Sequence, residues 1–240
     1  MKVLNTGVID PSWYDIFNVA FATLDPVYIQ SLQEDSNWLP GAEKIFNAFS
    51  LPLTKLNFIL FGESPYPRSA SANGYAFWDA NVEELWSEQG LSKSVNRATS
   101  LRNIIKMLLL ARGSLNEDNT SQAAIAKIDK TNLIKKGNDL FNAFLSRGIL
   151  LLNTSLVLKE SSLCTEVNAW LPFIESILQG VAIERSDLTL ILFGKVAQLI
   201  NTLPISQSFN RIYAEHPYNI SFIHNPHVLN FFRPLDLLSS

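Results

Sequence analysis

Short apolar runs that end in a glycine or an amide constrain the fold of this chain more than any other feature. The three clearest are Asn57–Phe61 before Gly62, Ile149–Leu152 before Asn153, and Leu188–Phe193 before Gly194. Runs of this length are typical of strands that are buried on both faces of a sheet. A weaker fourth strand is predicted over Arg211–Glu215. All four are far shorter than the roughly 18 apolar residues that cross a bilayer, so no membrane association is predicted.

Segments with a helical spacing of apolar residues separate the strands. Ser100 precedes the spaced apolar residues Leu101, Ile104 and Leu108, and we expect it to be the N-cap of a helix that ends near Gly113. Other helices are predicted over Leu133–Leu145, over Ala169–Ala182 with Pro172 in the first turn, over Val196–Thr202 and over Pro226–Phe232. Strands that alternate with helices predict an α/β fold: a single-domain α/β/α sandwich of residues 1–240 around a central, mostly parallel, four-stranded sheet.

The scarcity of cysteine and histidine limits the chemistry of the chain. One cysteine, Cys164, can form neither an intrachain disulfide nor a cluster that needs several thiolates. His224 and His227 are close in sequence, but they lack a third ligand at a suitable spacing, so we expect neither a metal nor another cofactor. The first seven residues, Met1 to Gly7, lack the basic and apolar segments of a signal peptide, which predicts a cytoplasmic protein.

The charge distribution gives only weak information about partners. A net charge of −3 argues against a protein that coats nucleic acid by bulk attraction. One stretch of fourteen residues nevertheless holds Lys93, Arg97, Arg102 and Lys106 without an acid. The simpler interpretation is an ordinary solvated helix face, and a local basic rim is the alternative.

The segments that follow the predicted strands are the candidates for a functional site, because ligands of such sheets bind beyond the carboxyl ends of the strands. These segments are Gly62–Asp79, Asn153–Ser155, Gly194–Lys195 and His216–His227, which we expect on one rim. The first offers a carboxylate, a hydroxyl and aromatic rings at Glu63, Ser64, Tyr66 and Phe77.

The residues of this rim also have purely structural interpretations. Phe77 is equally typical of a core residue. Asn153 either caps the loop that follows its strand or presents a donor and an acceptor to the edge of a base, since a buried amide needs partners. A lone histidine such as His216 is commonly a satisfied structural residue.

Six segments, taken in chain order, resemble motifs of the uracil-DNA glycosylases, specifically of their classical branch. Gly62-Glu-Ser-Pro-Tyr-Pro67, followed by Asn73-Gly74 and Phe77, is similar to the family's Gly-Gln-Asp-Pro-Tyr-His motif and the glycine and aromatic residues after it. The other similar segments are Ile45–Phe49, Ala98-Thr-Ser-Leu-Arg-Asn103, Gly148-Ile-Leu-Leu-Leu-Asn-Thr154, Leu192-Phe-Gly-Lys-Val-Ala-Gln198 and His216-Pro217. The first of these looks like the helix that precedes the family's first strand. The resemblance covers roughly Trp13 to Arg233.

The resemblance implies a pocket for a base that is flipped out of DNA. Phe77 would stack on uracil, Asn153 would pair with its amide edge, and Tyr66 would exclude the 5-methyl group of thymine. His216 would donate to the uracil oxygen on which negative charge develops. On the same grounds Ser100 and Ser221 would contact phosphates and Ile220 would fill the gap left by the base, while Arg102 and Tyr218 complete the residues expected to bind DNA.

Several residues depart from the family's pattern. Ser64 stands where the family has the aspartate that positions water and stabilises the sugar cation, and a neutral hydroxyl cannot offset that charge. Pro67, Ala98-Thr99 and Tyr218 replace the motif histidine, a double proline and the serine after His-Pro. The iron-sulfur branch of the superfamily also has Gly-Glu and lacks this aspartate, so Glu63 is the best candidate to hold the water.

Three functional hypotheses follow. The first is a monomeric glycosylase that hydrolyses the N-glycosidic bond of uracil in single- or double-stranded DNA, for base-excision repair, with altered or reduced catalysis because of Ser64. The second is an inactive protein that binds uracil or damaged DNA on the same scaffold. The third is a glycosylase with a shifted base preference. Tyr218 either blocks the DNA groove or stacks on DNA.

Overall fold

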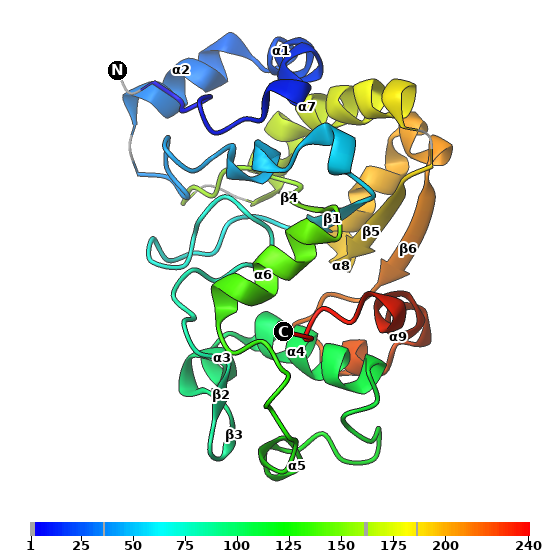
Figure 1. Ribbon diagram of the computed structural model, residues 1–240. Helices are drawn as coiled ribbons and strands as arrows, with labels where there is room; N and C mark the ends of the chain where they lie inside the picture. Colours follow the sequence, from blue (N-terminus) through cyan, green and yellow to red (C-terminus); the bar gives the residue numbers. More distant parts are fainter. Residues whose placement is uncertain (1–2, 36, 161–162, 186) are drawn as a thin grey trace.

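Four parallel strands form the centre of the molecule. The computed structural model describes residues 3–35, 37–160, 163–185 and 187–240, so Met1 and Lys2, at the start of the segment tested for a signal peptide, lie outside the described residues. The strands are β1 (Phe58–Gly62), β4 (Ile149–Asn153), β5 (Thr189–Phe193) and β6 (Asn210–Ala214). They pair in the order β4-β1-β5-β6, all in parallel (Figure 1). The predicted α/β fold with a central four-stranded parallel sheet is confirmed.

The strands are apolar throughout because both faces of the sheet are covered. Side chains alternate between the faces of a strand, so Ile59 and Phe61 enter one hydrophobic cluster and Leu60 enters the other. In β4, Leu150 and Leu152 join the first cluster. Leu151, which lies between them, belongs to the second cluster. The same alternation places Asn153, the last residue of the strand, on the face of Leu151.

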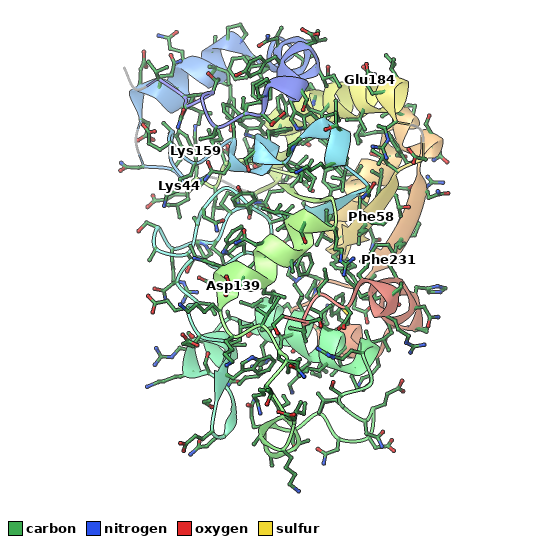
Figure 2. All side chains as sticks on the ribbon, in the orientation of Figure 1. Lys44, Phe58, Asp139, Lys159, Glu184 and Phe231 are labelled. Atoms are coloured by element: carbon green, nitrogen blue, oxygen red, sulfur yellow. The ribbon has the colours of Figure 1, made fainter. Side chains whose placement is uncertain are left out.

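Helices cover both faces (Figure 1). One layer holds α1 (Tyr14–Phe21), α2 (Pro26–Glu34) and α7 (Leu163–Glu184), and the other holds α4 (Thr99–Ala111), α6 (Gly137–Ser146) and α9 (Pro226–Phe232). The packing includes aromatic contacts: Phe58 of β1 meets Phe231 of α9 edge to face, with ring centroids 5.0 Å apart (Figure 2). No helix among the described residues is long and apolar enough to cross a membrane.

Shorter elements complete the fold. A hairpin of β2 (Trp86–Ser87) and β3 (Gly90–Leu91) lies with α3 (Lys93–Arg97) and α5 (Gln122–Ala126) at the end of the molecule away from α1 and α2 (Figure 1). Helix α8 (Gly194–Gln198) follows β5 directly. Short 3-10 helices occupy Pro11–Trp13, Asn47–Ser50, Leu53–Lys55, Leu199–Thr202, Pro204–Ser208, Ile220–His224 and Arg233–Leu235.

Two predicted features of helices are wrong. Ser100 is not an N-cap, because α4 begins at Thr99 with Ala98 in the capping position. Helix α3 ends at Arg97 and leads straight into α4, so the end of α3 determines where α4 starts. Pro172 lies in the interior of α7 rather than in a first turn, since α7 begins at Leu163; a hydrogen bond from Tyr28 to Glu166 anchors its early residues.

Some predicted boundaries also differ from the structure. The helix predicted from Leu133 begins only at Gly137, because the backbone of Ile134 bonds to Leu238 and Lys136 pairs with Glu84. The segment Ile45–Phe49, expected to be helical, forms turns that end in a 3-10 helix. The helix predicted over Val196–Thr202 is divided between α8 and the 3-10 helix that follows it.

Candidate functional site

A cavity of about 200 Å³ opens beyond the carboxyl ends of β1 and β4. It is lined by Gly62, Glu63, Ser64, Pro65, Tyr66, Pro67, Phe77, Ser100, Asn153 and His216. The structure therefore brings together every residue predicted to be catalytic or substrate-binding, and Ser100 as well. Pockets for drug-sized ligands usually exceed roughly 300 Å³, so this one suits a single small ring. We call it the base pocket.

Asn153 gives the base pocket an unsatisfied acceptor. It is the last residue of β4, opposite Gly62 of β1, and only 3% of its surface is exposed. Its Oδ1 atom is buried and has no hydrogen-bond partner among the described residues. A Cβ atom on Gly62 would lie 2.6 Å from this oxygen, so only glycine leaves room for the amide. A buried acceptor without a partner costs about 1–3 kcal/mol, which a ligand with an N–H group would recover.

The loop that carries Glu63 to Phe77 is bonded to the end of β4. The carbonyl of Gly62 accepts from both the backbone N–H and the hydroxyl of Thr154, at 2.9 and 2.8 Å. The carbonyl of Glu63 accepts from the N–H of Ser155 at 3.0 Å. Farther along, Ala76 donates to the carbonyl of Leu151 at 3.1 Å. Both ends of the loop are thus fixed to the strand that presents the amide of Asn153.

Phe77 forms an aromatic wall. Its φ angle is +60°, a conformation that costs a residue with a side chain about 1–3 kcal/mol. The hydroxyl of Tyr66 donates to its carbonyl at 3.2 Å and helps to hold it there. The ring lies 6.1 Å from that of Phe193 in the core and 5.7 Å from the imidazole of His216. Phe77 therefore belongs to the core and also lines the pocket, and its predicted role as a platform for a base remains a prediction.

Tyr66 closes the base pocket as a neutral group. Burial raises the pKa of its phenol well above the ordinary value, with a further contribution from the charge of Asp79. The hydroxyl keeps its proton at neutral pH and remains the donor to Phe77.

His216 is held in one orientation after β6. A Cβ atom on Gly194, whose φ is +84°, would come within 2.9 Å of the Cβ of His216, so the close approach requires glycine. The N–H of Tyr218 donates to Nδ1 of His216 at 3.1 Å. Burial lowers the pKa of the imidazole, while the nearby charge of Glu63 opposes this change. The ring is therefore neutral at pH 7, and Nε2 carries the proton and acts as a donor.

Glu63 and Ser64 differ in what they can do. Among the described residues that line the base pocket, Glu63 supplies the one carboxylate, and it is half-buried. The Ser64 hydroxyl has a single weak hydrogen bond of 3.5 Å, to the carbonyl of the neighbouring Pro65. Only Glu63 can carry a negative charge or accept a proton from water here.

The other residues predicted to bind DNA lie outside the base pocket. Tyr218 and Ile220 are 68% and 58% exposed on the loop after His216. The hydroxyl of Ser221 bonds to the carboxylate of Glu215, which helps to lower the pKa of that acid against the effect of burial. Arg102 is half-buried, and its guanidinium donates to the carbonyl of Asn96 at 3.2 Å and to Asn103 at 3.5 Å.

Asn103 has a structural role that our sequence analysis missed. It is fully buried in α4, and its Nδ2 atom lies 2.7, 3.4 and 3.5 Å from the carbonyl oxygens of Pro217, Tyr218 and Asn219. The amide therefore ties the loop after His216 to the helix that carries Ser100. The only signal in the sequence was its place at the end of the segment 98–103.

The described residues hold no group of three or more histidine, cysteine or acidic side chains that could bind a metal ion. His224 and His227 are exposed, and so is Cys164. What the structure does present is a small, partly apolar pocket with a buried amide, a neutral imidazole and a carboxylate.

The fold and the base pocket define a class: α/β/α proteins with a small polar pocket beyond the carboxyl ends of a parallel sheet. Comparison with known proteins narrows this class. No family model matches the sequence. The crystal structure of the wild-type UNG from Nitratifractor salsuginis matches with a TM-score of 0.91 and 41% identity, over 97% of this chain and 93% of that one. The chain belongs to the uracil-DNA glycosylase family.

More distant relatives that bear the name uracil-DNA glycosylase are also similar to this chain. The uracil-DNA glycosylase of Campylobacter jejuni is 26% identical over 199 residues, which cover 82% of this chain and 73% of that protein. The uracil-DNA glycosylase of Streptococcus mutans is 26% identical over 184 residues, covering 76% and 70%. The mimivirus uracil-DNA glycosylase shares the fold, with a TM-score of 0.58 and 16% identity over 88% of this chain and 70% of that one. The resemblance found in the sequence is confirmed.

Proposed function

We propose that this protein is a DNA glycosylase that hydrolyses the N-glycosidic bond of uracil in DNA, for base-excision repair, without a metal or other cofactor. The observation that carries the proposal is the buried, unpartnered Oδ1 of Asn153, a residue that lines a small pocket together with Phe77. Relatives that bear the name uracil-DNA glycosylase support it. A base inside a duplex cannot reach such a pocket, so the uridine would have to leave the stack first.

Uracil matches the groups of the pocket. Its N3–H would donate to Oδ1 of Asn153, and its O4 would accept from the Nδ2 of the same side chain. The ring would stack on Phe77. Tyr66, fixed by its bond to the carbonyl of Phe77, would stand against C5 and exclude the methyl group of thymine. Uracil and thymine differ only in this methyl group, so the position of Tyr66 would set the choice between them.

His216 would stabilise the leaving group. As the C1′–N1 bond breaks, its electron pair passes into the uracil ring and negative charge develops on O2. The Nε2–H of a neutral imidazole would donate to that oxygen, an oxyanion role of the kind worth about 10²–10³ in rate. The N–H of Tyr218 fixes the proton on Nε2, because a proton on Nδ1 would displace this hydrogen bond.

Glu63 would hold the water that completes the reaction. The water oxygen would bond to C1′ of the sugar cation and give up a proton to the carboxylate, while uracil leaves as the anion. Ser64 cannot offset the charge of the cation, so we propose a slower reaction than a family member with aspartate at this position would give.

DNA would be held around the mouth of the pocket. Ser100 and Ser221 would contact phosphates, as would the guanidinium N–H groups of Arg102 that do not bond to Asn96 or Asn103. Ile220 would enter the space left by the base, and Tyr218 would lie against the DNA beside it. A monomer, a single domain over residues 1–240 and a cytoplasmic location remain predictions.

Ser64 favours one alternative, a protein that binds uracil in DNA without cutting it. The test is cleavage of a uracil-containing oligonucleotide, single- and double-stranded, by the purified protein and by its Glu63→Ala and Asn153→Ala variants. Cleavage by the wild type that is lost in both variants supports the proposal. Binding without any product establishes the alternative. A panel of modified bases, hypoxanthine among them, tests for a shifted base preference.

A further inference from the structure

A second cavity, of about 300 Å³, is lined by residues that directly follow or closely precede residues of the base pocket. It is lined by Arg68, Asp79, Asn81, Val82, Lys93, Ser94 and Arg97. Arg68 directly follows Pro67, which lines the base pocket, and Arg97 lies three residues before Ser100, which does the same. Consecutive Cα atoms are about 3.8 Å apart, so the two cavities are close neighbours. We call this second one the basic cavity.

The basic cavity carries net positive charge in a protein whose overall charge is −3. Arg68 is paired with Asp79 at 3.0 Å, and this carboxylate is only 2% exposed. Lys93 and Arg97 are exposed, and neither forms a hydrogen bond or ion pair with any side chain that the structure describes. Two charges therefore remain without a counterpart among the described residues.

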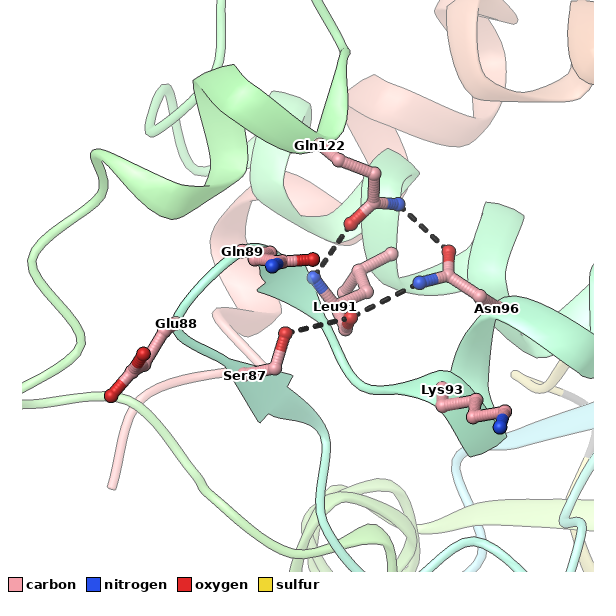
Figure 3. A pocket seen from close by; sticks show the side chains of 7 residues that line it. All are labelled: Ser87, Glu88, Gln89, Leu91, Lys93, Asn96 and Gln122. Carbon is pink, nitrogen blue, oxygen red and sulfur yellow. Dashed lines mark hydrogen bonds between the residues drawn. The ribbon is translucent and has the colours of Figure 1, made fainter.

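Hydrogen bonds hold helix α3, which carries both charges, to the hairpin and to α5, around a cavity that Lys93 also lines. Figure 3 shows how: the amide of Gln122 accepts from the N–H of Leu91 at 2.8 Å and donates to Oδ1 of Asn96 at 2.8 Å. Asn96 in turn donates to the carbonyl of Leu91 at 3.0 Å. Lys93 is drawn in the same view without a partner (Figure 3). The network fixes the backbone of α3 and leaves its cationic side chains for something outside the protein.

We propose that the basic cavity binds a backbone phosphate of the DNA strand whose uridine occupies the base pocket, close to that nucleotide, with Lys93 and Arg97 as its ligands. This inference rests on the proposed function. Phosphates follow one another at about 3.4 Å of helix axis along a strand, so a strand anchored in the base pocket carries phosphates at distances that a cavity this close can reach. Arg68, held by Asp79, completes the wall on the side of the pocket loop.

The test is the salt dependence of DNA binding. The probe is a duplex with 2′-fluoro-2′-deoxyuridine, because an electron-withdrawing fluorine disfavours the sugar cation and prevents cleavage. Each lost phosphate contact lowers the slope of log K against log salt by about 0.9. The double variant Lys93→Ala/Arg97→Ala should therefore lose about 1.8 from the slope and bind roughly 60-fold more weakly at 0.1 M salt.

Two further variants make the result specific. Lys55→Ala/Arg147→Ala removes the same two charges beside the amino ends of β1 and β4, opposite the pocket, and should keep the wild-type slope. Lys93→Arg/Arg97→Lys keeps the charges and should also keep the slope, which a merely structural role for these side chains would not predict.

Each outcome decides the matter. A lower slope in the alanine pair alone supports the phosphate site. A wild type that binds the duplex, with an alanine pair of unchanged slope, overturns the phosphate site and leaves the proposed function standing. Saturable binding of inorganic phosphate together with an unchanged slope assigns the cavity to free anions and overturns it as well. A wild type that neither binds the duplex nor cleaves uracil DNA overturns both proposals.

Discussion

The base pocket and the cavity beside the hairpin differ in the hydrogen bonding of the amide side chains that line them, which their sizes do not suggest. The hairpin cavity, drawn in Figure 3, is about 620 Å³ and is lined by Gln122, Asn96 and their neighbours. The base pocket is about 200 Å³. Yet the amides of Asn96 and Gln122 in the larger cavity are engaged on their oxygen and their nitrogen, whereas Oδ1 of Asn153 has no partner among the described residues.

The difference shows what distinguishes a binding site from a structural cavity. In a network whose donors and acceptors are all paired, a ligand can bind only by breaking existing hydrogen bonds. Each broken bond leaves a group unpaired. An unpaired buried acceptor already carries that cost in the free protein, and a ligand removes it. An amide side chain thus stabilises the fold in the hairpin cavity and keeps an unpaired acceptor in the base pocket.

The substitution Asn153→Ala should break this comparison most strongly. We expect uracil cleavage to fall by about 10³-fold or more, because the pocket loses its contacts to the base edge. Stability should stay the same or rise by about 1 kcal/mol, since a buried unpaired acceptor is removed. Single-turnover cleavage and urea unfolding of the same preparation measure the two effects. A clear loss of stability would mean that Asn153 is a structural amide after all.

The next largest effect is expected for His216→Ala, with a fall in the cleavage rate of about 10²–10³-fold from the loss of the donor to the leaving group. His224→Ala is the matched control, because His224 is exposed and lies outside the base pocket. It should stay within about twofold of the wild type. Equal effects of the two substitutions would remove His216 from the reaction.

In the hairpin cavity the pattern should be reversed. Gln122→Ala leaves the N–H of Leu91 without its acceptor and should lower the free energy of unfolding by about 1–3 kcal/mol. Cleavage should change by less than about threefold at saturating DNA. Gln89→Ala, on the same cavity but with no hydrogen bond to a described residue, should stay within about 0.5 kcal/mol of the wild type. A catalytic defect in Gln122→Ala at saturating DNA would show that the two cavities are not independent.

The smallest effect sharpens the picture of the base pocket itself. In NMR titrations the pKa of His216 should lie below 6.5, because burial disfavours the imidazolium. Removing the charge of Glu63 by Glu63→Gln should lower this pKa further, since the carboxylate opposes the effect of burial. An unchanged pKa in the variant would place Glu63 too far from His216 to share its site.

The sheet and its rim could be predicted from the sequence because they follow from local apolar runs. Strands buried on both faces need such runs, and parallel strands bring their carboxyl ends together. Asn153 and His216 were therefore expected on one edge before their contacts were known. The family motifs gave roles to Tyr66 and Phe77, and without them Phe77 is equally typical of a core residue.

The features that escaped prediction depend on contacts between distant parts of the chain. The two-residue strands β2 and β3 have no apolar run, and they are fixed by Gln122, which lies more than thirty residues later. Serine is a residue type that N-caps prefer, and Ser100 therefore looks like one in the sequence. The end of α3 nevertheless determines where α4 begins. The positive φ of Phe77 likewise results from the bonds around it and not from its own preference.

The amide of Asn103 has a consequence for how the protein would search DNA. It joins α4 to the turn at residues 217–219, so Tyr218 and Ile220 already project from a braced loop in the free protein. A loop that becomes ordered only on binding costs conformational entropy at every site, whereas a loop that is already held in place does not. A protein that slides along DNA through backbone contacts could then test each base step during a brief encounter, because the loop that would enter the base stack is already ordered.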